Sequence, residues 1–140
     1  MGDVSAIQML KARYFRAIDT KDWDLLATVF TEDVEIDVTD DVEGGEVYTG
    51  RDRFVATVSR ILADAITVHH GHMPEIELTG PDTATGIWAM EDDVDWGPGP
   101  DGATRRFTGA GHYHEAYVRE ADGTWRIAAM RLTRLRRDWH

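Results

Sequence analysis

Apolar residues recur at helical spacing in three stretches of the N-terminal half. Over residues 4–18 they stand three or four positions apart, at Ile7, Leu10, Tyr14 and Ile18, as on one face of an amphipathic helix. Residues 19–22 interrupt this pattern with cap-forming side chains, and a shorter helix follows that carries Leu25, Leu26, Val29 and Phe30. Asp52 stands where it can cap a third helix, whose apolar residues are Phe54, Val55, Val58, Ile61 and Leu62.

Alternation of apolar and polar residues replaces helical spacing in the C-terminal half. Residues 34–38 alternate strictly and predict an early strand, and longer strands are predicted over residues 67–78, 83–96, 107–118 and 124–135. The acidic, glycine-containing residues 40–50 predict a loop near the mouth of a pocket. Glycines and prolines predict a second loop over residues 97–102, and residues 121–123 predict a hairpin turn.

This order of elements predicts an α+β fold. Helices followed by long strands in hairpin order form an antiparallel sheet with the helices on one face. Long antiparallel strands twist and curl, so the concave side becomes a cone that the helices close around a small-molecule cavity. Trp88, Met90 and Trp96 share one strand face and form either a wall of this cavity or plain core. A length of 140 residues fits a single domain over residues 1–140.

Composition narrows the class of partner. A net charge of −11 disfavours nucleic acid and anionic membranes, because phosphate binding needs clustered lysine and arginine. The sequence has no cysteine, which excludes thiol catalysis and thiolate metal sites. We see no signal peptide, membrane-spanning stretch, P-loop or dinucleotide-binding glycine motif, so we expect a cytoplasmic protein that uses no cofactor.

A few polar residues on these elements could carry chemistry. Asp19 ends the first helix, and a carboxylate beside an imidazole fixes the tautomer of the ring and raises its basicity. Asp19 could equally cap the second helix. Tyr14 could be a core residue, and Arg134 a surface charge on the last strand. Of the neighbours His69 and His70, only one can face a pocket unless the strand carries a bulge.

His112 and His114 share one face of their strand and are candidates for substrate contacts. Two imidazoles at this spacing also resemble half of a metal site. No acidic residue stands after His114 at the spacing usual for a cupin motif, so we expect no metal. Phe107, Tyr113 and Tyr117 would then lie on the opposite face. An exposed apolar sheet face usually marks an interface, which predicts a homodimer or higher homo-oligomer through the sheet.

Three segments resemble the SnoaL-like group of the nuclear transport factor 2-like superfamily. Residues 15–24 (FRAIDTKDWD) are similar to the start of scytalone dehydratase, where the matching aspartate belongs to the active site. Residues 67–78 (TVHHGHMPEIEL) are similar to the strand that carries the catalytic histidine in that enzyme and in hexachlorocyclohexane dehydrochlorinase. Residues 123–134 (GTWRIAAMRLTR) resemble their last strand. The resemblance covers nearly the whole chain.

The resemblance implies particular roles for residues of this chain. The Asp–His dyad of the dehydratases falls on Asp19 and His69. Counting the register back from residues 76–78 selects His69, whereas a shift of one residue would select His70. Tyr14 matches a tyrosine of bile-acid dehydratase, and Arg134 matches an arginine on the last strand of that enzyme and the dehydrochlorinase. His112 and His114 fall near polar substrate contacts of scytalone dehydratase.

The resulting hypothesis is a cofactor-independent lyase or isomerase of the dehydratase type. His69, oriented by Asp19, would abstract a carbon-bound proton from an apolar, ring-containing small molecule. Tyr14 and one of His112 or His114 would hydrogen-bond an oxygen of the substrate, while Arg134 would attract that oxygen or orient the dyad. The alternatives are a polyketide-type cyclase and a non-catalytic module that binds a small molecule in the same cavity.

Overall fold

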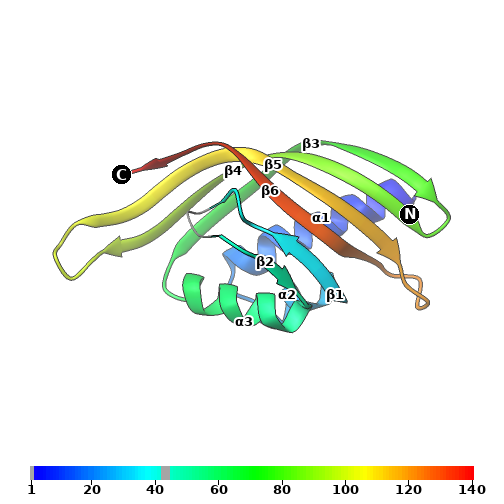
Figure 1. Cartoon of the computed structure of the whole chain (residues 1–140), viewed down its shortest axis with the longest axis horizontal. Coiled ribbons are helices and arrows are strands. Elements are labelled where there is room, and N and C mark those ends of the chain that lie inside the picture. Colours follow the sequence, from blue (N-terminus) through cyan, green and yellow to red (C-terminus); the bar gives the residue numbers. More distant parts are fainter. Residues whose placement is uncertain (1, 42–44) are drawn as a thin grey trace.

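The computed structural model describes residues 2–41 and 45–140. In this part of the chain, Figure 1 shows helices α1 (Asp3–Asp19), α2 (Trp23–Thr28) and α3 (Arg51–Leu62), with strands β1 (Phe30–Asp37), β2 (Val47–Thr49), β3 (Ile66–Gly80), β4 (Thr83–Pro98), β5 (Thr104–Arg119) and β6 (Trp125–Trp139). Helical spacing and alternation had located the helices and the long strands. None of the described helices is both long and apolar enough to cross a membrane.

The strands of the described residues form one six-stranded sheet in the order β2-β1-β6-β5-β4-β3. The long strands β3 to β6 pair antiparallel in hairpin order, which confirms the predicted order. The sheet as a whole is mixed, because β1 runs parallel to β6 with Ile36 beside Met130. Strands β2 and β3 are its two edges, so the sheet curls without closing.

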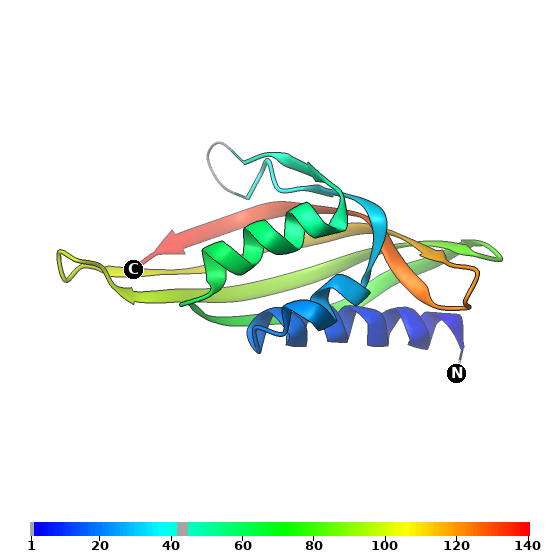
Figure 2. The same cartoon turned by 90° about the horizontal axis from the view of Figure 1, so that it is seen from below.

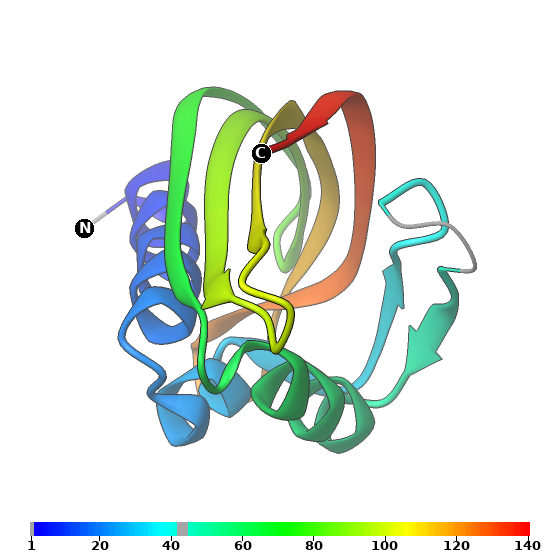
Figure 3. The same cartoon turned by 90° about the vertical axis from the view of Figure 1, so that its left-hand side faces the viewer.

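Helices cover only the concave face of this sheet. Figure 3 looks along the long strands and shows the sheet curled, with the helices at its open side; Figure 2 shows α1 and α3 lying along it. The core forms between these layers and includes Ile7 and Leu10 of α1, Val34 and Ile36 of β1, and Ile127 of β6, each buried. The predicted α+β architecture, with helices on a curved sheet, is therefore confirmed.

The helix ends differ from the sequence-based expectation at two places. Helix α2 ends at Thr28, and Phe30 already belongs to β1 rather than to the helix. The cap of α2 is Asp22, whose carboxylate accepts from the backbone N–H of Leu25 at 3.1 Å. The predicted cap of α3 by Asp52 is wrong, because Gly50 occupies the N-cap position.

The two predicted loops are also shorter than expected. Strand β2 lies inside the predicted loop over residues 40–50, where it pairs with β1 through Tyr48 and Ile36. Residues 42–44 of that loop lie outside the described residues. Strand β4 continues through Gly97 to Pro98, so the second loop begins only after the first two of its predicted residues.

The faces of β5 are the reverse of those we predicted. Tyr113 and Tyr117 are buried on the concave face, at 2% and 1% exposure, and Phe107 is buried there as well. His112 and His114 consequently point to the outer, convex face. Alternation separates residues into two faces without saying which one meets the core. The larger aromatic rings lie on the side that the helices cover. These rings therefore do not form the exposed apolar face that we expected.

Candidate active site

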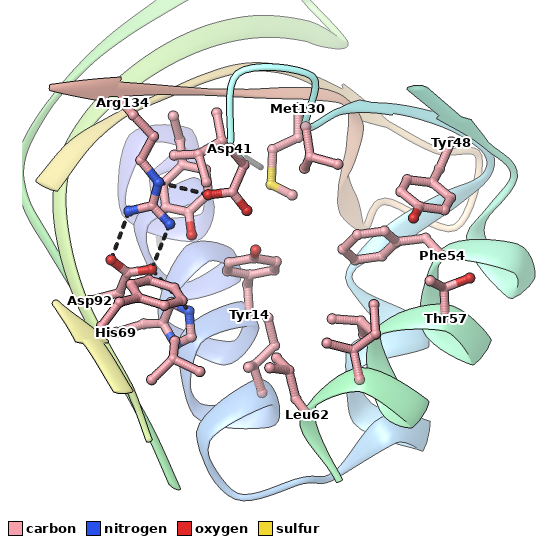
Figure 4. Close-up of a pocket in the computed structure, with 18 of the residues that line it drawn as sticks. Tyr14, Asp41, Tyr48, Phe54, Thr57, Leu62, His69, Asp92, Met130 and Arg134 are labelled. Atoms are coloured by element: carbon pink, nitrogen blue, oxygen red, sulfur yellow. Dashed lines mark hydrogen bonds and ion pairs between the residues drawn. The ribbon is translucent and has the colours of Figure 1, made fainter. Parts of the chain in front are cut away.

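A cavity of about 190 Å³ lies between the helices and the concave face of the sheet. Its acidic and basic side chains gather at one end, as Figure 4 shows, and they are Asp41, His69, Asp92 and Arg134. The opposite end, toward α3, is apolar and aromatic, with Tyr48, Phe54 and Leu62. An apolar cavity with a few convergent polar groups is the usual form of a site for a small molecule.

Asp19 and His69 form a hydrogen-bonded pair beside the charged end of the cavity. His69 Nδ1 lies 2.7 Å from Asp19 Oδ1, and the backbone N–H of His69 donates to Asp19 Oδ2 at 2.9 Å. The Thr67 hydroxyl also donates to Asp19 Oδ1 at 2.9 Å, and Lys21 Nζ donates to that hydroxyl at 2.9 Å. These contacts fix the carboxylate relative to the imidazole ring.

A β-bulge in β3 sets the orientation of the histidines on this strand. His72 pairs with Ala89 of β4, whereas Glu75 pairs with Ile87, so β3 contains one residue more than its partner over this stretch. An extra residue shifts the alternation of side chains between the two faces. Residues before the bulge therefore occupy the opposite faces from those that an uninterrupted strand would give them.

His69 faces the cavity as a result, with a side chain that is 8% exposed. His70 points outward, is 61% exposed and lies 3.5 Å from Glu91. Alternation counted without a break from Ile76 would instead put His70 on the inner face. The bulge is thus the local feature that brings His69 rather than His70 to Asp19.

The environment of Asp19 determines the tautomer of His69. Burial alone raises the pKa of Asp19, but hydrogen bonds from the His69 ring, the His69 backbone and Thr67 outweigh it and lower that pKa. The ionised carboxylate can only accept, so His69 Nδ1 carries the proton of their shared hydrogen bond. In the neutral ring Nε2 is then the nitrogen without a proton, and it lies 4.0 Å from Asp92 Oδ2 at the cavity wall.

Arg134 joins two carboxylates at the same end of the cavity. Its terminal nitrogens donate to Asp92 Oδ1 at 2.7 Å and to Asp92 Oδ2 at 2.9 Å, and its Nε donates to Asp41 Oδ1 at 2.7 Å. Burial lowers the pKa of Arg134, but Asp92 and Asp41 outweigh burial and raise it. The guanidinium therefore stays charged and fixes Asp92 beside His69.

Two tyrosines contribute to the cavity wall from opposite layers. Tyr14 comes from α1 and Tyr113 from β5, and their ring centroids lie 5.8 Å apart in an edge-on arrangement. Figure 4 shows the Tyr14 hydroxyl directed into the cavity. Burial raises the pKa of both phenols, so each keeps its proton at neutral pH and can donate it in a hydrogen bond.

The structure brings together four of the side chains singled out from the sequence. Tyr14, His69 and Arg134 line the cavity, and Asp19 lies directly behind His69. Trp96, which we expected to form either an apolar wall or core, lines the cavity too.

Four other candidates lie elsewhere in the molecule. Trp88 is buried in the core, where its Nε1 donates to the Tyr117 hydroxyl at 2.9 Å. Met90 is buried with its Sδ 3.9 Å from an Arg134 nitrogen, behind the cavity wall. The expectation that His112 or His114 contacts a substrate in the cavity is wrong, because both are on the convex face.

Sequence reasoning missed Asp92, Asp41 and Tyr113. Asp92 had a detectable signal, since a carboxylate stands there in a strand face that is otherwise apolar, between Met90 and Val94. Tyr113 was assigned to the wrong face, and Asp41 stands in a loop whose position no local pattern encodes. Among residues 2–41 and 45–140, no three His, Asp or Glu side chains gather in a way that could hold a metal ion.

Comparison with known proteins agrees with this architecture. The sequence model of the SnoaL-like domain matches residues 1–131. A crystallised protein of Kribbella flavida is similar over 97% of this chain and 93% of its own, with 26% identity and a TM-score of 0.85. The fold is also that of a protein of Novosphingobium aromaticivorans named as a candidate scytalone dehydratase, with 21% identity, a TM-score of 0.83, and coverage of 99% of this chain and 87% of that one.

A further similar structure is a type 2 hexachlorocyclohexane dehydrochlorinase. It has 21% identity and a TM-score of 0.81, and the match covers 97% of this chain and 87% of that enzyme. These likenesses extend over almost the full length of each protein, as the sequence resemblance had implied. The match to the family model includes α1 and the bulged strand β3, which carry Asp19 and His69, and it ends within β6 before Arg134. The chain therefore belongs to the SnoaL-like domain family, with the nuclear transport factor 2-like fold.

Proposed function

We propose that this protein is a cofactor-independent lyase or isomerase that removes a carbon-bound proton from a ring-containing small molecule. The observation that carries the proposal is the Asp19–His69 pair, joined at 2.7 Å, with His69 in the wall of the cavity. A carboxylate that holds the imidazole in one tautomer is the arrangement that general base catalysis needs. The dehydratase and dehydrochlorinase relatives are consistent with it.

The proposed step begins with transfer of the substrate proton to His69 Nε2. The electron pair of the broken C–H bond moves into the ring system. In an isomerase it forms an enolate that is reprotonated at another carbon. In a dehydratase it forms a C=C bond as the neighbouring C–O bond breaks, and the proton returns from His69 to the departing hydroxide to give water. Asp19 stabilises the imidazolium in both cases.

Other residues of the charged end have distinct proposed roles. Tyr14 and Tyr113 would donate hydrogen bonds to the substrate oxygen on which negative charge develops. Arg134 would position Asp92 rather than bind that oxygen itself, because its nitrogens already donate to Asp92 and Asp41. His112 and His114 have no part in this scheme.

Proton abstraction can be measured before the natural substrate is known. The cyclic ketone 2-tetralone carries acidic C–H groups, and their exchange in deuterated buffer is followed by proton NMR. We expect the protein to accelerate exchange above the buffer rate, and His69→Ala or Asp19→Asn to reduce that acceleration by about 10²–10⁴-fold, the usual contribution of a positioned base.

His70→Ala is the matched control for this experiment. It removes a neighbouring imidazole from the same strand, but one that is 61% exposed and outside the cavity. Exchange rates should then equal those of the unaltered protein. Equal rates for His69→Ala and the unaltered protein would refute the proposed base, and the cavity would be better treated as a binding site.

We also propose that the chain is cytoplasmic and forms a homodimer or higher homo-oligomer through the convex face of the sheet. Support for the interface no longer comes from Phe107, Tyr113 and Tyr117, which face inward. It comes from the helices, which leave the convex face uncovered (Figure 3), and from apolar side chains at that face such as Ile66 and Val68, which are 73% and 42% exposed.

A further inference from the structure

The charges at this end of the cavity are already paired with one another. Among the described residues of its wall, the carboxylates of Asp41 and Asp92 face the guanidinium of Arg134. Arg137, just outside the wall, lies 3.9 Å from Asp41 Oδ1. Because the side chains of Arg134 and Asp92 are only 8% and 3% exposed, solvent screens these charges poorly. An anionic ligand entering this end would lie beside two carboxylates and a guanidinium that they already pair with.

Arg134 is in addition almost fully occupied as a donor. A guanidinium has five N–H groups, and three of those of Arg134 donate to oxygens of Asp41 and Asp92. Another points at Met90 Sδ, 3.9 Å from the nitrogen. Within the described residues, this leaves one N–H for a ligand, whereas the strong pairing of arginine with a carboxylate uses two.

A cationic ligand is disfavoured for the complementary reason. An ammonium at this end would lie beside the charged guanidinium, and the nearest carboxylate oxygens already accept from Arg134. An uncharged oxygen has better partners, because the Tyr14 and Tyr113 hydroxyls line the cavity and burial keeps both protonated. Hydrogen bonds from these hydroxyls stabilise a carbonyl or hydroxyl oxygen without burying a new charge.

We propose that the cavity takes an uncharged, oxygen-bearing molecule of one or two fused rings and rejects carboxylates of the same size. The volume of about 190 Å³ sets the size, since an apolar cavity of about 150 Å³ holds one benzene molecule. The ring system lies toward Phe54 and Leu62, and the oxygen lies at the charged end (Figure 4). This inference deepens the proposed function and rests on it for treating the cavity as a substrate site.

Three unreactive probes with one ring system test the charge preference directly. They are 2-naphthylmethanol, 2-naphthoate and 2-naphthylmethylammonium, titrated into the full chain by calorimetry at pH 7.5. We expect the alcohol to bind at least about tenfold more tightly than either ion, since an unpaired or like charge in a buried site costs several kcal/mol. A carboxylate or ammonium that binds as tightly as the alcohol overturns the proposal, and so does failure of the alcohol to bind at millimolar concentration.

A pair of variants tests whether Arg134 is the cause. Asp41→Asn removes a charge that Arg134 Nε contacts at 2.7 Å. Asp40→Asn removes the same charge one residue away, where the carboxylate accepts from the backbone N–H of Arg134 at 2.8 Å rather than from its guanidinium. We expect Asp41→Asn to reduce the ratio of alcohol affinity to naphthoate affinity by about threefold or more. The reason is that one carboxylate fewer then offsets the positive charge of Arg134, which can attract the naphthoate. Equal changes in both variants would reject this explanation.

Failure of this inference is distinguishable from failure of the proposed function. The probes do not react, so their affinities do not depend on whether the Asp19–His69 pair catalyses. A naphthoate preference together with exchange activity that His69→Ala abolishes would reject only the substrate class. The expected probe preference together with exchange that His69→Ala leaves unchanged would reject only the catalytic role.

Discussion

The ammonium group of Lys11 lies inside the core, directly beneath the tyrosines of the cavity wall. It is 2.7 Å from Glu115 Oε2, and both side chains are fully buried. It also lies 3.8 Å from the ring centroid of Tyr14 and 3.5 Å from that of Tyr113, close enough for cation–π attraction. Burial lowers the pKa of Lys11 from 10.5 to about 8, against the opposing effect of Glu115.

This lowered pKa makes the stability of the protein depend on pH in a defined window. Between about pH 8 and 10.5 the unfolded chain still binds the Lys11 proton while the folded chain has lost it, so the free energy of unfolding rises with pH. Below about pH 8 both states are protonated and the cost of burying the charge is fully present. From pH 7.5 to 10, the free energy of unfolding measured with urea should rise more for the unaltered protein than for a double variant, Lys11→Met with Glu115→Gln. The extra rise should be on the order of 1–2 kcal/mol.

The double variant is the appropriate reference because it removes both charges. Replacing a buried ion pair by uncharged groups is often neutral for stability, whereas Lys11→Met alone leaves the Glu115 carboxylate buried and should cost about 3–5 kcal/mol. The difference in free energy of unfolding between the unaltered protein and the double variant should rise over this pH range. A difference that stays flat or falls would contradict the lowered pKa of Lys11.

Gly109 allows a test of whether the Arg134–Asp92 ion pair shapes the ligand site. A methyl group at this position would clash with a terminal nitrogen of Arg134 and lie 2.7 Å from Asp92 Oδ1. Both are ends of long or adjustable side chains, so Gly109→Ala should leave the fold intact while displacing the Arg134–Asp92 pair. We expect the affinity for 2-naphthylmethanol to fall about tenfold, or about 1.4 kcal/mol, with little change in Tm.

Gly111, two residues along the same strand, is the matched comparison. There a methyl group would clash with the backbone carbonyl of Thr133, which cannot move without disturbing the pairing of β5 with β6. Gly111→Ala should therefore lower Tm markedly. Unchanged probe affinity in Gly109→Ala would mean that the ion pair does not shape the ligand site.

At the scale of elements, the bulge in β3 is the feature on which the candidate site depends. Met73 lies within it, with a side chain that is 93% exposed and a backbone φ of +26°. The side chain contributes little packing, so its role is to add one residue to the strand. That residue lets His69 and Ile76, which are an odd number of positions apart, both face inward.

Deletion of Met73 should remove the bulge and leave His69 facing the cavity. Without the extra residue, His69 and Ile76 lie six positions apart, so regular alternation puts both side chains on the inner face and His69 stays paired with Asp92. We therefore expect tetralone exchange to remain far above that of His69→Ala, which should lose about 10²–10⁴-fold. Met73→Gly keeps the extra residue and suits a positive φ, so it should retain activity as well. Exchange that falls to the level of His69→Ala after the deletion would contradict this account of the bulge.

The elements show which parts of the fold the sequence encodes locally. Helical spacing around Ile7 and Leu10 and the alternation along β4 and β5 arise from one buried face, so they can be recognised in isolation. The parallel pairing of Phe30–Asp37 with the last strand joins segments about ninety residues apart, and Val47–Thr49 is too short to show a period. Neither has a local signal.

The candidate site was predictable to a similar degree. The Asp19–His69 contact came from resemblance, because nothing local says that the end of a helix meets a particular strand residue. His112 was placed on the wrong face because alternation divides a strand into two faces but does not indicate which of them packs against the core. Asp92 could have been found from its position in an apolar strand face, but its pairing with Arg134 depends on two strands that are not neighbours in the sheet.

For the whole molecule, the uncovered convex face is the main unexplained surface. The helices lie on the other side of the sheet (Figure 3). Ile66 and Val68 of β3 and Ile87 of β4 are exposed on this face, at 73%, 42% and 37%. His112 lies near its centre, with Ala89 and Thr133 beside it on the neighbouring strands. Small side chains around a histidine give a flat surface, which suits contact with a second copy of the same face.

In the predicted assembly, apolar contact between the convex faces favours association, whereas repulsion between the like-charged chains disfavours it. Each chain carries a net charge of −11, so association should strengthen with ionic strength as salt screens the repulsion. Light scattering at micromolar concentration should give at least twice the chain mass in moderate salt. His112→Glu adds a charge to the face and should shift the mass toward one chain, while Ala56→Glu on the exposed side of α3 adds the same charge away from it. A mass of one chain for the unaltered protein at every salt concentration would contradict the assembly and leave the convex face free for another partner.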